Sequence, residues 1–289
     1  MNKLLVPTDF SENAVNAFKY ALNIAAKQDA SIMTLHVYSL KISNLEMGTP
    51  VELTQSILEN QETREEEHYK KFTEKIHQEA TEENLSHVPI NHKLIEGLVV
   101  DEIVHESKKE SPDLIVLGTD GVDNLADRLF GTTTSNVIEN VGCAVLTVPA
   151  DAEYHGIHRV AYASDFNTED VETLKEILEF AALFDASVHV VHISEEGSPT
   201  TEDESRMSEL KRHFITSEEA GKVVFDLVTA NDTVEGLEHY IEAEAIDILV
   251  MFKEKETFWE RLFNPSLTRK IALHGKKPLL VLKKKLEID

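Results

Sequence analysis

One sequence pattern occurs twice in this chain, and this repeat limits the folds available to it more than any other feature. The segment KLLVPTDFS at residues 3–11 corresponds to RVAYASDFN at 159–167, an offset of 156. Further along, PDLIVL at 112–117 corresponds to IDILVM at 246–251, an offset of 134, so the second copy has a shorter middle. A chain of 289 residues is also about twice the length of an ordinary domain. We therefore predict two domains of one fold, over residues 1–150 and 151–289.

Each copy alternates short apolar segments with stretches that have helical spacing. In the first copy, strands are predicted near residues 4–7, 31–37, 90–95, 114–117 and 144–148. The second copy follows the same order, with strands near residues 159–162, 187–193, 222–228, 247–252 and 279–282. Strands that alternate with helices form parallel sheets covered on both faces. The prediction is an α/β fold of two tandem Rossmann-like domains, each with a five-stranded parallel sheet, joined by a linker over residues 151–158.

Charge and composition restrict the environment and the partners. The chain has 28 basic and 53 acidic residues, a formal net charge of −25, and such a field repels nucleic acid. No segment approaches the ~20 apolar residues that span a bilayer, and the N-terminal apolar run is too short for a signal peptide. The single cysteine, Cys143, cannot form an internal disulfide, and its place before a buried strand favours an inert core thiol over a redox sensor. We expect a soluble cytoplasmic protein without nucleic-acid or membrane partners.

The segment with the most chemical information follows the strand at 114–117. It reads Gly118-Thr-Asp-Gly121, then nine residues, then Gly131 and a run of threonines that opens a helix. Glycines let backbone approach a ligand closely, and a helix start offers free N–H groups to phosphate. The first strand ends at Asp9, and ligands of open parallel sheets bind where strands end. Simple turns and helix caps would use the same residue types, so this pattern alone leaves both interpretations open.

The spacing Gly118-x2-Gly121-x9-Gly131-Thr132 resembles the nucleotide-binding signature of the ATP-binding universal stress proteins. Val6–Ser11 resembles the first strand and turn of that family, and the resemblance covers nearly the whole chain, twice. It implies an adenosine contact at the end of the first strand, an adenine pocket at the end of the second, and glycines and threonines along the ribose and phosphates. The residues that it implies are Pro7, Thr8, Asp9, His36, Val37, Leu117, Gly118, Gly121, Gly131, Thr132, Thr133 and Thr134.

Two departures from the family pattern qualify this implication. Asp120 stands where the family often has a histidine; its carboxylate weakens the case for phosphate, or favours a divalent cation such as Mg²⁺ or Mn²⁺ beside the phosphates. The second copy has Phe252 in place of Gly118, and Pro265 removes an N–H from its helix start. Asp165 keeps the place of Asp9, which leaves room for weak binding of an adenosine-sized ligand. We predict one ATP per chain, bound in the first domain.

Metal sites and catalytic signatures are not evident. His189 and His192 are three residues apart on one strand, which places them on opposite faces, and no cysteine pairs occur. The sequence contains no GxSxG and no GxxxxGK[ST] motif. We therefore predict no catalytic residue, no metal site, and at most slow ATP hydrolysis. Three functions stay open. We favour a nucleotide-dependent regulatory or protective module in a stress response. The alternatives are an enzyme of the same fold class that hydrolyses adenine nucleotides or uses them for adenylation, and a partner-binding protein that binds no nucleotide.

The resemblance also has implications for assembly. Tandem members resemble a dimer of single domains fused into one chain, with the two domains related by a pseudo-twofold axis. Their last strands, predicted at 144–148 and 279–282, are apolar. Because an unpaired apolar edge is an aggregation hazard, we predict that these two strands pack against each other. A homodimer of whole chains is a further implication of the resemblance.

Overall fold

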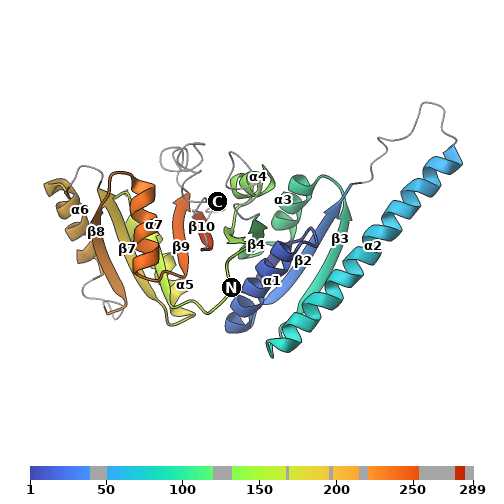
Figure 1. Cartoon of the computed structure of the whole chain (residues 1–289), viewed down its shortest axis with the longest axis horizontal. Helices are drawn as coiled ribbons and strands as arrows, with labels where there is room; N and C mark the ends of the chain where they lie inside the picture. The colour runs from blue at the N-terminus through green and yellow to red at the C-terminus, as the bar shows by residue number, and fades with distance from the viewer. Residues whose placement is uncertain are drawn as a thin grey trace. The chain divides into compact units, whose positions relative to one another are not determined.

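The computed structural model describes residues 1–39, 51–119, 132–166, 169–194, 198–214, 221–253 and 277–283 (Figure 1). Its contacts divide the chain into two compact units. The first consists of Met1–Gly118 and Thr132–Cys143, and the second of Thr119–Gly131 and Ala144–Asp289. No helix among the described residues combines the length and apolar character needed to cross a membrane.

The first unit is a parallel sheet whose strands alternate with helices along the chain. Its strands lie in the order β3-β2-β1-β4. They are β1 (Lys3–Pro7), β2 (Ser31–Tyr38), β3 (Ile90–Glu96) and β4 (Leu114–Thr119). Its helices are α1 (Glu12–Gln28), α2 (Val51–Glu82), α3 (Val99–Glu110) and α4 (Thr132–Asn140). The buried strands β1, β2 and β4 form the core together with the apolar face of α1.

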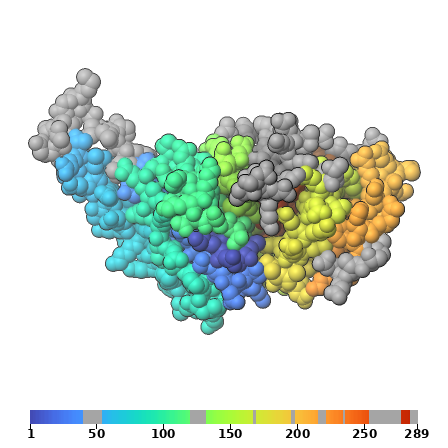
Figure 2. Space-filling model, turned by 180° about the vertical axis from the view of Figure 1, so that it is seen from behind, coloured from blue at the N-terminus to red at the C-terminus, as the bar shows by residue number. Residues whose placement is uncertain are grey.

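Helices cover both faces of this sheet, as the alternation along β3 makes clear. His92 of β3 lies against Tyr69 of α2, with ring centroids 6.2 Å apart, whereas the next residue, Lys93, pairs with Glu106 of α3. Successive residues of a strand point to opposite faces, so α2 and α3 cover opposite faces. Figure 1 shows α1 and α2 on the near side, and the reverse view in Figure 2 shows α3 in green at the surface.

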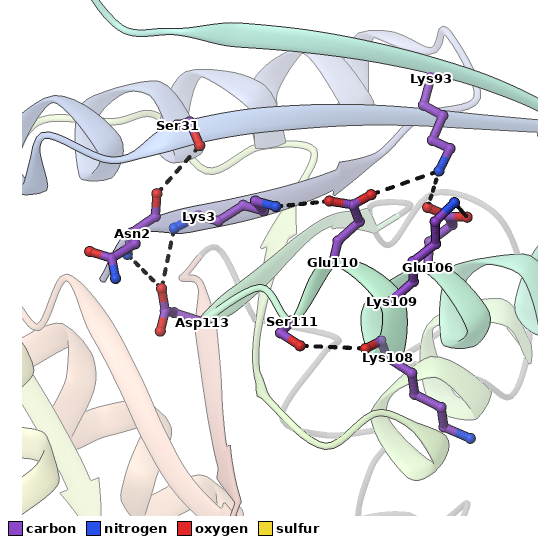
Figure 3. Close-up of polar contacts among 10 residues, drawn as sticks. All are labelled: Asn2, Lys3, Ser31, Lys93, Glu106, Lys108, Lys109, Glu110, Ser111 and Asp113. Carbon is purple, nitrogen blue, oxygen red and sulfur yellow. Dashed lines mark hydrogen bonds and ion pairs between the residues drawn. The ribbon is translucent and has the colours of Figure 1, made fainter.

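A polar network holds the α3 side of the first unit together (Figure 3). Glu106 is only 2% exposed and pairs with Lys93 of β3. Glu110, one turn further along α3, pairs with Lys3 of β1 at 2.8 Å. Asp113 accepts hydrogen bonds from the backbone N–H of Lys3, at 3.2 Å, and from that of the residue before it, where β1 begins. These contacts join two strands to one helix, and a buried carboxylate such as Glu106 is tolerated because it is paired.

The second unit repeats this alternation of strands and helices, and its sheet also includes one strand of the first sequence copy. Its order is β5-β10-β9-β6-β7-β8. Five strands are the second copy's own: β6 (Arg159–Ala163), β7 (Ser187–Ser194), β8 (Val223–Thr229), β9 (Ile248–Lys253) and β10 (Leu279–Lys283). Its described helices are α5 (Asp170–Ala182), α6 (Thr201–Arg212) and α7 (Thr233–Ala243). The parallel sheets with alternating helices confirm the predicted α/β fold.

The added strand, β5 (Ala144–Pro149), is the last strand of the first sequence copy. It pairs antiparallel with β10, the last strand of the second copy, with Leu280 opposite Leu146. The predicted pairing of the two last strands is therefore confirmed. The pseudo-twofold relation of the two domains and the domain boundary at residue 150 stay predictions.

Candidate functional site

Three of the predicted site residues lie where neighbouring strands of the first unit end. β1 pairs in parallel with β2 on one side and with β4 on the other, so Asp9, Val37 and Gly118 all lie at or just beyond the carboxyl ends of adjacent strands. The chain runs from β1 to β2 and β3 in one direction, and β4 lies on the opposite side of β1. Ligands of open α/β sheets bind in the crevice at such a reversal of strand order.

The loop after β1 has a fixed and strained shape. The backbone N–H of Thr8 donates to the carbonyl of Leu35 at 2.9 Å, and Thr8 Oγ1 accepts from the N–H of Phe10 at 3.1 Å. Asp9 Oδ1 accepts from the N–H of Ser11 at 3.0 Å, and the Asp9 side chain is exposed. Phe10 has φ 69°, a left-handed conformation that is rare for a bulky residue and that clusters at functional sites. The loop thus presents an oriented carboxylate to solvent.

Three side chains, one from the loop and two from distant segments, hold this loop in place, and we call them the loop clamp: Phe10, His36 and Glu65. His36 Nδ1 donates to the carbonyl of Thr8 at 2.6 Å, which fixes its tautomer because a carbonyl only accepts. Its ring stacks on Phe10 at 3.9 Å between centroids, and Nε2 lies 3.5 Å from a carboxylate oxygen of Glu65 on α2. The imidazole of His36 therefore supports the loop. The prediction that its backbone and that of Val37 line an adenine pocket stays a prediction.

The second unit contains the same clamp. His192 Nδ1 donates to the carbonyl of Ser164 at 2.8 Å, its ring stacks on Phe166 at 4.2 Å, and Nε2 lies 3.6 Å from Asp203. Phe166 also has a left-handed φ, 59°. Because the second copy keeps the clamp without the glycine motif, the clamp serves the fold of the loop. The clamp was not predicted from the sequence, although the sequence holds a signal for it, since Phe and His both recur at the offset of 156.

Gly118 is required by a close approach of two elements. A Cβ atom there would lie 2.6 Å from the carbonyl oxygen of Asn13 and 3.1 Å from the backbone nitrogen of Ala14, in the first turn of α1. The absence of a side chain therefore lets β4 pack against the start of this helix. That Gly118 also lies beneath the ribose and phosphates of a bound nucleotide stays a prediction.

The second unit differs at this point. Phe252 occupies the position of Gly118, and α5 begins at Asp170, two residues later than α1 under the offset of 156. Asp170 is 2% exposed, and its carboxylate accepts a hydrogen bond from Tyr162 Oη at 2.7 Å and another from Ser164 Oγ. Burial raises the pKa of the Asp170 carboxyl. The matching residues of the first copy include the apolar Val6 and Ala14, so the two units differ chemically beneath the same loop.

Helix α4 contributes the last part of the candidate site. Its first turn contains Thr132, Thr133 and Thr134 and no acidic side chain. The first N–H groups of a helix lack intrahelical partners and carry the positive end of the dipole. Thr132 is exposed and Thr133 is half-buried, whereas Thr134 is 6% exposed. The hydroxyls of the first two threonines are thus the accessible ones. The predicted site residues Gly121 and Gly131, and also Asp120, lie outside the described residues.

The electrostatic character of the candidate site changes along the sheet edge. Burial, and then the carboxylates of Glu62 and Glu96, raise the pKa of Tyr38 at the end of β2, with Glu65 and Glu66 adding to the effect. The end of β2 is therefore in a negative field, much of it from α2. A phosphate group would be repelled there, whereas the first turn of α4 has no acidic side chain to oppose it.

Comparisons with known proteins agree with this description. The sequence model of the universal stress protein family matches residues 1–149 and again residues 156–283. A universal stress protein of Methanocaldococcus jannaschii is 32% identical over 146 residues, 50% of this chain and 81% of that protein. One from Synechocystis is 24% identical over 269 residues, 87% of this chain and 89% of that protein.

A solved structure covers the chain over almost its full length. The universal stress protein from Archaeoglobus fulgidus has a TM-score of 0.67 at 17% identity and covers 98% of both chains. At this identity the structural likeness supports the fold alone. The two family matches together span most of the sequence. This chain therefore belongs to the universal stress protein family and carries two of its domains in tandem.

Proposed function

We propose that the first domain binds ATP and that the protein acts as a nucleotide-dependent regulatory or protective module in a stress response. The observation that carries the proposal is the reversal of strand order between β1 and β4. There, the exposed carboxylate of Asp9 lies just beyond the end of β1, and the glycine-rich segment that leads to α4 begins at the end of β4. An exposed carboxylate can accept hydrogen bonds from ribose hydroxyls or a base amino group, and a free helix start can bind phosphate.

The charge distribution suggests which end of the nucleotide lies where. The adenosine, which is uncharged, suits the end of β2, where acidic side chains raise the pKa of Tyr38. The triphosphate suits α4, whose first turn has two accessible threonines and no acidic side chain. The negative phosphates would also attract a divalent cation, Mg²⁺ or Mn²⁺, and the cation belongs to this proposal.

The second domain is proposed to lack ATP. Phe252 places a large side chain where the first domain needs a glycine, and α5 begins later than α1. The buried Asp170 adds a carboxyl group beneath the loop. Each change works against a nucleotide that must approach the backbone closely and carries several negative charges. The expected stoichiometry is one ATP per chain.

Isothermal titration calorimetry on nucleotide-stripped protein tests this proposal, with Asp9→Ala and Asp165→Ala as a matched pair. The two aspartates occupy equivalent loops at the offset of 156. Asp9→Ala should weaken ATP, ADP and adenosine alike, by about tenfold or more, since a lost hydrogen bond to a charged group costs about 1.5–3 kcal/mol. Asp165→Ala should leave ATP affinity unchanged. Two equivalent sites per chain, or equal losses in both variants, would show the proposal to be wrong.

A further inference from the structure

Two histidines from different elements face each other on the α2 side of the first unit. His77 lies on α2 and His92 on the edge strand β3, and their Nε2 atoms are 3.0 Å apart. The ring planes are inclined at 83°, and the centroids are 5.1 Å apart. Both side chains are at the surface, so a ligand from solution can reach them. The prediction that the chain has no metal site rested on histidines close together in the sequence. His77 and His92 lie on two different elements, so that reasoning did not cover them.

The hydrogen bonds behind His92 determine which of its nitrogens carries the proton. Tyr69 Oη donates its one hydrogen to the carbonyl of Thr34 at 3.0 Å and accepts from the N–H of Lys93 at 2.6 Å. The Thr34 hydroxyl has one hydrogen, and it can be donated to the carbonyl of Asn91 at 3.5 Å or to Tyr69 Oη at 3.1 Å. When Thr34 donates to either of these oxygens, the 2.9 Å contact between Thr34 Oγ1 and His92 Nδ1 has His92 as its donor. The lone pair of His92 is thus on Nε2, the atom that faces His77.

This arrangement has the features of a metal ligand with its supporting shell. Metal-bound histidines donate their second ring N–H to a neighbouring oxygen, which fixes the tautomer and the ring orientation. Here Thr34 is fully buried and Tyr69 is 8% exposed, so the supporting groups are themselves held in place. Two imidazole nitrogens bound to one ion at about 2.0–2.1 Å, with bond angles of about 90–110°, lie about 2.9–3.4 Å apart. The observed 3.0 Å is within this range.

The second unit shows that the fold does not need polar groups here. The strand register that places Thr34 opposite His92 places Val190 opposite Phe225 in the second copy. Phe225 in turn lies near Phe214, with ring centroids 6.5 Å apart. An apolar cluster thus fills the equivalent place between sheet and helix. The buried polar network is specific to the first unit.

We propose that His77 and His92 form a surface site for a divalent transition-metal cation such as Zn²⁺, with both Nε2 atoms as ligands. Within the described residues, no group of three or more histidine, cysteine or carboxylate side chains is arranged to hold a metal ion. The site therefore has two protein ligands, and water or an added ligand completes the coordination. A bound ion would connect α2 to the edge strand β3. First-row ions that favour imidazole, Zn²⁺, Ni²⁺ and Cu²⁺, are the expected occupants.

The test uses the full chain, free of nucleotide and of any histidine tag, titrated with Zn²⁺ by calorimetry and by thermal unfolding. His77→Gln removes one ligand at an exposed position of α2, and His87→Gln, an exposed histidine between α2 and β3, is the matched control. His77→Gln should lower Zn²⁺ affinity at least about tenfold and abolish the Zn²⁺-induced rise in Tm. His87→Gln should behave as the unmodified chain, and circular dichroism should show both variants folded.

A spectroscopic measurement distinguishes this site from scattered binding to other histidines. Electron paramagnetic resonance of one equivalent of Cu²⁺ should show hyperfine coupling to two imidazole nitrogens, reduced to one in His77→Gln. Equal Zn²⁺ affinity and Tm response in the unmodified chain and His77→Gln would overturn the proposal. So would a Cu²⁺ spectrum that this substitution leaves unchanged; the 3.0 Å contact would then be a hydrogen bond only.

Discussion

Gly118→Ala tests the close approach of β4 to α1 directly. The added Cβ would be 2.6 Å from the carbonyl oxygen of Asn13 and 2.8 Å from its carbonyl carbon, and real Cβ contacts essentially never fall below 3.0 Å. Strand and helix must therefore separate by at least about 0.4 Å. Backbone atoms cannot rotate away as a side-chain end can, so we expect the upper part of the usual overpacking cost, about 2–3 kcal/mol.

Urea denaturation followed by circular dichroism measures this cost. Gly221→Ala is the control, because a Cβ at Gly221 would meet nothing within 4 Å, and its effect should stay within about 0.5 kcal/mol. Gly118→Ala should lower the midpoint, and ATP affinity should fall with it because the loop after β1 leads directly into α1. A Gly118→Ala protein as stable as the control would refute the idea that backbone contact with Asn13 requires this glycine.

Three further predictions concern the phosphate segment, the second unit and the polar network. Gly131→Val should weaken ATP about tenfold or more in calorimetry and spare adenosine, because it blocks backbone approach to phosphate alone; unchanged ATP affinity would contradict it. Burial raises the pKa of Asp170 above 3.8, so the folded state holds its proton more tightly and loses stability as pH rises through the raised pKa. The stability of Asp170→Asn relative to the unmodified chain should therefore increase from about pH 4 upward in urea titrations, and a flat difference would exclude this linkage. Lys93→Met leaves the buried Glu106 without its main partner and should lower the free energy of unfolding by about 2–4 kcal/mol. Lys108→Met changes an exposed side chain and should lower it by less than about 0.5 kcal/mol. Equal urea midpoints for the two variants would contradict this prediction.

The sequence repeat was sufficient to predict the fold because each copy carries complete local patterns. The strand predicted at 114–117 is observed as β4, Leu114–Thr119, and the strand predicted at 279–282 is observed as β10, Leu279–Lys283. The sequence also predicted which strand ends meet, since the ends of adjacent parallel strands lie at one edge of a sheet. Parallel order then placed the ends of β1, β2 and β4 together.

Contacts between distant segments could not be predicted in the same way. The sequence analysis explained Gly118 by the approach of backbone to a ligand, and the sequence does not identify Asn13, 105 residues earlier, as a backbone neighbour. His36 stacks on Phe10 and faces Glu65, and no spacing rule links three residues on a strand, a loop and a helix. The facing pair His77 and His92 depends on how α2 lies along β3, which hydrophobic periodicity does not determine.

The pairing of β5 with β10 has a consequence for how the chain is made. Leu279, where β10 begins, comes 130 residues after Pro149, where β5 ends. At about 5–20 residues per second, a ribosome needs on the order of ten seconds to cover that distance, and until then β5 has no β10 to pair with. Its apolar edge is open during this interval, as a long-range pairing must wait for its second strand. The sheet of the second unit can close only after β10 has been made, and a nascent chain stalled before β10 would keep an aggregation-prone edge.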